Sequence, residues 1–265
     1  MLRARLATAA VAIPLLVWLI CAGPAWLFAG VVLAVTTIGL GEFAAMALAG
    51  RPVAQLLAII AGLAFAGVVV LHRADALGFV LILTTVGGLI LSLLDPDIPG
   101  AAQRLAQGMI AAIYVGFLLP HAVNLRMLPS GARWVFFVVA CAMAADSGGY
   151  FAGRFLGRTK LFPRVSPKKT VEGAIGALLG SVAIAYFARW VFSPPDLDPR
   201  ETAFLGICLG VLAQVGDLIE SMLKRAYGAK DSGWIFPGHG GVLDRIDSLV
   251  LPVVFTYYLV AGLGL

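Results

Sequence analysis

The sequence is poor in charge and in the residues that build metal or disulfide centres. Only 12% of its 265 residues are Asp, Glu, Lys or Arg, whereas a soluble domain of this size has about 25%. Its three histidines and three cysteines show no CxxC or zinc-type spacing. Each cysteine falls inside an apolar run, so we expect packing roles for Cys21, Cys141 and Cys208. These absences argue against an ordinary soluble domain, a disulfide scaffold and a zinc module.

Long apolar runs dominate what remains. Hydrophobic residues make up 61% of the chain, and the mean hydropathy is +0.98. The runs do not alternate as barrel strands do, and a spanning helix needs about 20 apolar residues. The fold class predicted is therefore all-α: a polytopic helical membrane protein with about nine transmembrane helices. The predicted spans are 6–23, 25–48, 54–72, 77–94, 105–128, 134–153, 172–193, 202–223 and 247–265.

Domain organisation follows from the spacing of these runs. No internal repeat or low-complexity tract stands out, and no soluble domain fits between the spans. We expect one membrane domain over 1–265. Residues 1–130 read as a helical scaffold, and residues 131–265 hold nearly all the clustered ionisable groups.

The basic residues predict the orientation. The net charge is +5, and in a membrane protein such an excess is better explained by cytoplasmic loops than by nucleic-acid binding. If the N-terminus is cytoplasmic, 14 of the 19 Lys and Arg residues lie on the inner side. The loops 154–171 and 224–246 then share that face. The short, Ala/Leu-rich chain favours a bacterial inner membrane, and its basic N-terminus reads as the start of a first span rather than a cleaved signal.

Few polar residues interrupt the N-terminal spans. Glu42 lies within the second span, and buried acids in membranes are often functional, although a structural role as a hydrogen-bond or ion-pair partner within the bundle is favoured here. His121 and Asn124 follow Pro120 in the fifth span. A lone histidine beside a proline is more often structural than a ligand, and we expect that here.

Residues 146–157 mark the start of the chemically richer half. Asp146 lies within an apolar span and precedes Gly148, Gly149, Gly153 and Gly157. Glycines at this spacing let another helix or a phosphate approach the backbone. The acid inside the span favours a functional role for Asp146.

The basic loop that follows ends at a predicted helix start. Lys168 and Lys169 precede Thr170, a plausible N-cap with Glu172 in the first turn. Mobile ammonium groups before a helix N-terminus make a good phosphate site. Contact with lipid headgroups explains the same cluster equally well.

The last polar stretch, 214–247, carries the strongest signal. Asp217, Glu220, Ser221 and Lys224 share one face of a predicted helix. Carboxylates on both sides of a basic loop suggest a divalent metal bound with phosphates, because Mg²⁺ prefers oxygen ligands. The predicted metal ligands are Asp217 and Asp244, and the basic residues predicted to neutralise phosphate charge are Lys224, Arg225, Lys230 and Arg245.

Three motifs together resemble the phosphatidate cytidylyltransferase family, also called CDP-diacylglycerol synthases. The family signature matches from Ser221 to Asp247, and the resemblance covers the C-terminal half. Gly149 is a small departure, because the family often has Ala there. The matching residues are Ser221, Lys224, Arg225, then Lys230, Asp231, then Pro237, Gly238, His239, Gly240, Gly241, then Asp244, Arg245, Asp247, with Asp146 to Arg154 and Ser166 to Gly173 upstream.

The resemblance implies transfer of CMP from CTP to phosphatidate, giving CDP-diacylglycerol and pyrophosphate. It also implies dependence on Mg²⁺, with K⁺ as a candidate second cation. On this basis the expected catalytic residues are those already assigned to metal and phosphate. The expected substrate-binding residues are Asp146, Lys168, Lys169, Thr170, Ser221, Asp231, His239, Gly240, Gly241 and Asp247.

Two other functions fit parts of the pattern. A CTP-dependent enzyme acting on an isoprenoid lipid would need the same headgroup chemistry. A transporter could hold intramembrane acids, but transporters often pair broken helices in two repeated halves, whereas the ionisable residues here gather in one half. A homodimer is also plausible for a bundle of this size.

Overall fold

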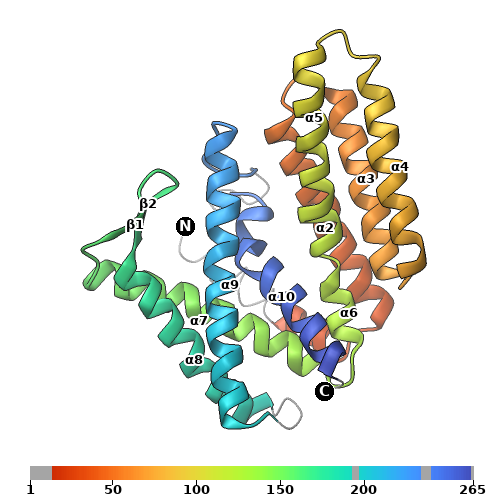
Figure 1. Cartoon of the computed structure of the whole chain (residues 1–265). Helices are drawn as coiled ribbons and strands as arrows, with labels where there is room; N and C mark the ends of the chain where they lie inside the picture. Colours follow the sequence, from red (N-terminus) through yellow and green to blue (C-terminus); the bar gives the residue numbers. More distant parts are fainter. Residues whose placement is uncertain (1–13, 193–196, 234–239, 264–265) are drawn as a thin grey trace.

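The computed structural model describes residues 14–192, 197–233 and 240–263. They form a bundle of long helices with one small β-hairpin (Figure 1). Residues 14–21 are helical. The elements that follow are α2 (Ala25–Ala47), α3 (Pro52–Val70), α4 (Ala74–Ser92), α5 (Ile98–Ala111), the π-helix η1 (Ala112–Leu118), α6 (His121–Met127), α7 (Gly131–Phe155), β1 (Lys160–Phe162), β2 (Ser166–Thr170), α8 (Val171–Phe192), α9 (Pro199–Ala226) and α10 (Leu243–Leu263).

The helices confirm the predicted fold class. Within the described residues, 8 helical segments are long and apolar enough to cross a membrane. They correspond to the predicted spans from the second to the ninth. The first predicted span, 6–23, begins in residues outside the described part, and its stretch 14–21 is helical.

The outer surface of the bundle is apolar. Phe79, Leu93 and Trp190 are 67%, 82% and 78% exposed, and no residue of α4 is buried. Such exposure is costly in water but favourable against lipid tails. The exposed apolar side chains are therefore the lipid-facing surface of a membrane protein.

The span predicted at 105–128 is longer and less regular than expected. It begins at Ile98, because Asp97 caps the helix by accepting a hydrogen bond from the Gly100 N–H (3.2 Å). It then continues through the π-helix η1 and turns at Pro120 into α6. Proline lacks an N–H and disrupts the helical ladder, which accounts for the break before His121.

The helices fall into two groups joined by α10. In Figure 1, α2 to α6 lie on one side, α7 to α9 lie on the other, and α10 runs between them. The largest core cluster includes the fully buried Trp134 and Phe137 of α7, packed with Leu205 and Leu209 of α9. This packing fixes α9, which carries much of the polar signature.

Glycines let α7 and α8 pack with their backbones almost in contact. A Cβ on Gly148 would collide with the Gly176 carbonyl, and one on Gly153 would lie 3.2 Å from the Thr170 hydroxyl. The close approach predicted for this glycine run is therefore confirmed, and the approaching partner is a helix.

The hairpin between α7 and α8 was not predicted. Its strands are antiparallel, with Lys160 opposite Thr170 and Phe162 opposite Ser166. The Glu172 carboxylate accepts hydrogen bonds from the N–H groups of Arg158 and Thr159, which ties the base of the hairpin to α8. Strands of three and five residues are too short to give a clear alternating pattern.

Candidate active site

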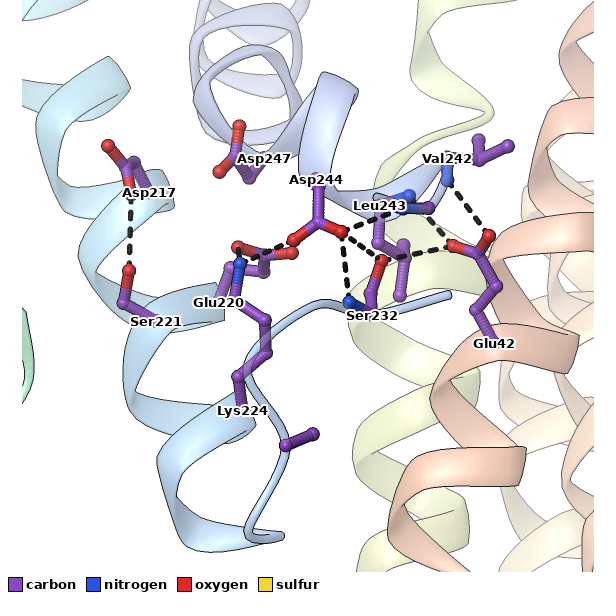
Figure 2. A network of polar contacts seen from close by, with 12 residues as sticks. Glu42, Asp217, Glu220, Ser221, Lys224, Ser232, Val242, Leu243, Asp244 and Asp247 are labelled. Carbon is purple, nitrogen blue, oxygen red and sulfur yellow. Dashed lines mark hydrogen bonds and ion pairs between the residues drawn. The ribbon is translucent and has the colours of Figure 1, made fainter. Parts of the chain in front are cut away.

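The site begins where α9 and α10 approach closely. A Cβ on Gly216 would collide with the carbonyl oxygen of Asp247, so only glycine permits this spacing. The contact brings the polar face of α9 against the start of α10, where Asp244 lies in the first turn and Asp247 follows it (Figure 2). Two segments of the predicted signature are thus joined by backbone packing.

Lys224 joins the two helices electrostatically. Its Nζ lies 2.5 Å from Glu220 Oε2 and 2.5 Å from Asp244 Oδ1. Glu220 is only 2% exposed, and an isolated charge buried this deeply would be very costly. The ammonium therefore balances two carboxylates, as Figure 2 shows.

The second oxygen of Asp244 is held by the loop before α10. Asp244 Oδ2 accepts hydrogen bonds from the N–H and the hydroxyl of Ser232 (2.9 Å each) and from the Gly241 N–H (2.8 Å). Gly240 has a φ of 81°, which disfavours residues with a side chain. Gly240 and Gly241, which were predicted to bind substrate, thus belong to the turn that holds Asp244, and their contact with substrate stays a prediction.

Asp217 forms a separate ion pair with the hairpin. Lys169 Nζ lies 2.7 Å from Asp217 Oδ2, and the Ser221 hydroxyl donates to Asp217 Oδ1 (3.3 Å). The hairpin thus delivers a lysine to a carboxylate 48 positions later in the chain. Lys168, the preceding residue, is exposed.

Asp146 and Asp247 extend the acidic region between these pairs. The Ser248 hydroxyl donates to Asp146 Oδ2 (3.2 Å), and the Ser248 N–H donates to Asp247 Oδ1 (2.7 Å). Asp247 interacts electrostatically with Asp217 and Asp146. Residues from α7, α9 and α10 therefore meet in one region, which brings Asp146 close to Asp247 and Ser248.

The remaining predicted residues lie around this region rather than inside it. Thr170 is buried, and its hydroxyl accepts from the Gly173 N–H (3.1 Å), so it caps α8 as predicted. His239 lies outside the described residues. The exposed members are Arg225, Lys230, Asp231 and Arg245.

The carboxylates offer oxygen ligands but no ready-made cage. Among the residues that the structure describes, no group of three or more His, Cys, Asp or Glu is arranged to hold a metal ion. Instead, Asp217 forms an ion pair with Lys169, and Asp244 forms one with Lys224. This chemistry fits Mg²⁺, which usually takes only one or two protein carboxylates and completes its shell with phosphate and water.

Two residues of this region, Ser232 and Tyr114, were not among the predicted site residues. Ser232 is buried and donates to Asp244, and it follows Lys230 and Asp231 within the stretch that matches the family signature, which is the signal that could have identified it. The Tyr114 hydroxyl is buried in η1 without a hydrogen-bond partner among the described residues, and it interacts electrostatically with Asp217, Glu220 and Asp247. A π-helix at a polar site is a common functional feature, but hydropathy alone does not reveal one.

The histidine expected to be structural is confirmed as such. His121 is 2% exposed. Its Nδ1 donates to the Phe117 carbonyl (2.9 Å), so Nε2 is the acceptor for the Tyr258 hydroxyl (3.1 Å). Both ring nitrogens are therefore used within the bundle.

Comparison with known proteins identifies relatives of this chain. Curated relatives named "Phosphatidate cytidylyltransferase" are 40% identical over 153 residues in Bacillus subtilis, 44% over 132 in Synechocystis and 41% over 148 in Brucella suis. These matches cover 57%, 50% and 54% of this chain and 56%, 44% and 53% of the relatives, so they span about half of each protein. The profile of the Cytidylyltransferase family matches residues 3–263. The chain therefore belongs to the cytidylyltransferase family.

Proposed function

We propose that this protein is a phosphatidate cytidylyltransferase. In the proposed reaction, a phosphate oxygen of phosphatidate attacks the α-phosphorus of CTP. The bond from that phosphorus to the α–β bridging oxygen breaks, and pyrophosphate leaves with the electron pair. The names of the curated relatives support this reaction. One observation carries the proposal: two ion pairs hold α9, α10 and the hairpin together. Lys224 of α9 pairs with Asp244 of α10, and Lys169 of the hairpin pairs with Asp217 of α9.

Phosphoryl transfer needs positioning and charge neutralisation more than proton transfer. Lys169 and Lys224 are buried enough to have fixed positions, whereas Arg225, Lys230 and Arg245 are exposed. We assign the fixed ammonium groups to organising the reacting phosphates. The exposed basic residues are suited to capturing the triphosphate and stabilising the leaving pyrophosphate.

Mg²⁺ is the proposed cofactor, and K⁺ is a candidate second cation. Asp217 and Asp244 would hold Mg²⁺, since both present carboxylate oxygens at places where the protein already stabilises positive charge. The bound ion would offset the negative charge of the phosphates.

The membrane arrangement supports access from two directions. We propose a bacterial inner membrane with the hairpin and the loop after α9 on the cytoplasmic side, as the basic residues predict. CTP would then arrive from the cytoplasm and phosphatidate from the inner leaflet. Assembly into homodimers stays a prediction.

A direct assay tests the reaction. The protein purified in detergent is supplied with labelled CTP, phosphatidate and Mg²⁺, and both the CDP-lipid and pyrophosphate are measured with and without EDTA. Equal amounts of both products, lost with EDTA, are expected. Parallel reactions with an isoprenoid lipid phosphate identify the acceptor. If the folded protein binds CTP but leaves phosphatidate unchanged, the proposed acceptor is wrong.

A further inference from the structure

A carboxylate from the N-terminal half of the chain reaches the signature loop. Glu42 lies on α2, and its side chain points to the start of α10, about 200 residues later in the sequence (Figure 2). Oε1 accepts from the Val242 N–H (2.9 Å), and Oε2 accepts from the Leu243 N–H (3.0 Å). Oε2 also lies 3.2 Å from the Ser232 hydroxyl.

These contacts make Glu42 a cap for another helix. The first N–H groups of a helix have no partner within it, and a negative charge is favourable there. Leu243 is the first residue of α10, and Asp244 is the second. A displacement of this helix end would therefore move Asp244 directly.

Ser232 connects Glu42 to Asp244. Its single hydroxyl proton lies between Asp244 Oδ2 (2.9 Å) and Glu42 Oε2 (3.2 Å), so it donates to one of them at a time. Ser232 precedes the stretch 234–239, and Val242 follows it. Glu42 thus fixes the chain on both sides of that stretch.

The surrounding glycines show how closely Glu42 is enclosed. A Cβ on Gly233 or Gly241 would collide with its carboxylate. Glu42 is 7% exposed, and a charge buried this far is retained only where strong hydrogen bonds or a partner offset its desolvation. Both oxygens are occupied by the loop, so substrate contact is not the role that this geometry gives it.

We infer that Glu42 is a positioning residue for the transfer reaction, which holds Asp244 in place through the first turn of α10 and Ser232. The inference rests on the proposed function for its catalytic consequence. Its structural consequence, protection of the Val242 and Leu243 amides, is independent of that function.

Glu42→Gln is the principal test variant. An amide keeps the shape but replaces one acceptor oxygen with a donor that faces other donors. We expect kcat to fall by about 10- to 100-fold, the usual effect of a small displacement of reacting groups, with little change in either KM. Glu42→Asp keeps the charge but is one methylene shorter, so an intermediate loss is expected. In combination with Ser232→Ala, the effects should be less than multiplicative because both act through Asp244.

Thr36→Val is the matched control. Thr36 lies on the same helix and is 0% exposed, but among the described residues its hydroxyl donates only to the Val32 carbonyl of that helix (2.8 Å). Its kcat should stay at the wild-type value. An equal loss in Thr36→Val would mean that any change in α2 disturbs the site, and the positioning role would be wrong.

Hydrogen–deuterium exchange gives a readout that needs no turnover. In Glu42→Gln, the amides of Val242 and Leu243 should exchange faster than in the wild-type protein, while those of α7 stay protected. Wild-type exchange at both amides would overturn the inference, as would wild-type kcat in folded Glu42→Gln protein. An inactive wild-type protein with slow exchange at these amides would count against the proposed reaction alone.

Discussion

The ammonium of Lys224 bridges carboxylates of two helices, lying 2.5 Å from Asp244 on α10 and 2.5 Å from Glu220 on its own helix. Glu220 is 2% exposed, and its other oxygen has no hydrogen-bond partner among the described residues. The positive charge of Lys224 therefore stabilises both carboxylates, those of Glu220 and Asp244.

Removing that charge should destabilise the protein strongly. Lys224→Met keeps the aliphatic stem but leaves Glu220 and Asp244 without their cation. Breaking one side of a buried ion pair costs about 3–5 kcal/mol, so a clearly lower melting temperature in detergent is expected. The double variant with Glu220→Gln should recover part of the loss, because the unpaired buried charge is also removed. A single variant as stable as the wild type would show that the carboxylates are neutral or solvated.

The close approach of α9 and α10 predicts a strong effect of one methyl group. Gly216→Ala introduces a Cβ that collides with the backbone of Asp247, and overpacking of this kind costs about 1–3 kcal/mol. Activity should fall as well, since the helices that hold Asp217 and Asp244 must separate. Thermal unfolding and turnover of the same preparation measure both effects.

Gly30→Ala is the control for this substitution. Gly30 lies inside α2, and apart from its chain neighbours and the adjacent backbone of that helix, no atom of the described residues lies within 4 Å of the position that a Cβ would take there. Alanine stabilises a helix interior by about 0.5–1 kcal/mol relative to glycine, so this variant should unfold at the same or a higher temperature. Equal losses in both variants would contradict the account of helix packing.

The contacts of Asp95 and Asp97, in the loop before α5, should make the stability of the protein depend on pH. The Arg104 guanidinium donates to Asp97 (2.8 Å) and holds the pKa of that carboxyl below its usual value of 3.8. The Asp97 N–H, together with Arg104, lowers the pKa of Asp95 in the same way. A pKa that is lower in the folded state gives stability that is complete above the unfolded value and is lost as the pH falls through the folded one.

Arg104→Gln should therefore lower the melting temperature at pH 7 more than at pH 3. The difference in melting temperature between the variant and the wild type should begin to decrease as the pH falls below about 4, where the carboxylates of the unfolded chain take up protons. The Thr36 hydroxyl donates to the Val32 carbonyl rather than to a carboxylate, so the melting temperature of Thr36→Val should differ from that of the wild type by the same amount at every pH. A difference for Arg104→Gln that is independent of pH would show that Arg104 acts through packing of its stem instead.

Local patterns predicted the helices well and their mutual contacts poorly. Apolar runs located the second to ninth spans, because burial in lipid imposes the same length on each helix. The spacing of Asp217, Glu220 and Lys224 predicted a shared polar face, and the contacts of these residues with α10 and the hairpin agree with it. Such patterns depend only on near neighbours in the chain.

Contacts between distant segments have no such pattern. Glu42 was recognisable as an unusual intramembrane acid, but its partners Val242 and Leu243 offer only backbone N–H groups, which every residue type except proline has. The hairpin was not predicted for a similar reason, because its strand pairing depends on backbone contacts within a short basic loop. The start of α5 was misplaced because its cap, Asp97, lies in a polar turn.

Lys168 and Lys169 are adjacent in the sequence and were both predicted to bind substrate, but their side chains have different surroundings. Successive residues of a strand point to opposite faces, and in β2 the side chain of Lys169 reaches Asp217 while Lys168 is exposed. Lys169→Met should lower kcat/KM by about tenfold or more, the scale of one lost charged contact in the transition state. Lys168→Met should have a much smaller effect, mainly on capture of the anionic substrates. The side chains of Lys169 and Asp217 are 25% and 32% exposed, more than the 11% and 10% of Lys224 and Asp244, so the loss of the Lys169 pair should lower stability less than the loss of the Lys224 pair. A fall in activity without a large fall in melting temperature therefore identifies a role in the reaction. Equal effects of the two substitutions would instead mean that the loop acts through its total charge, as a surface for anionic lipid would.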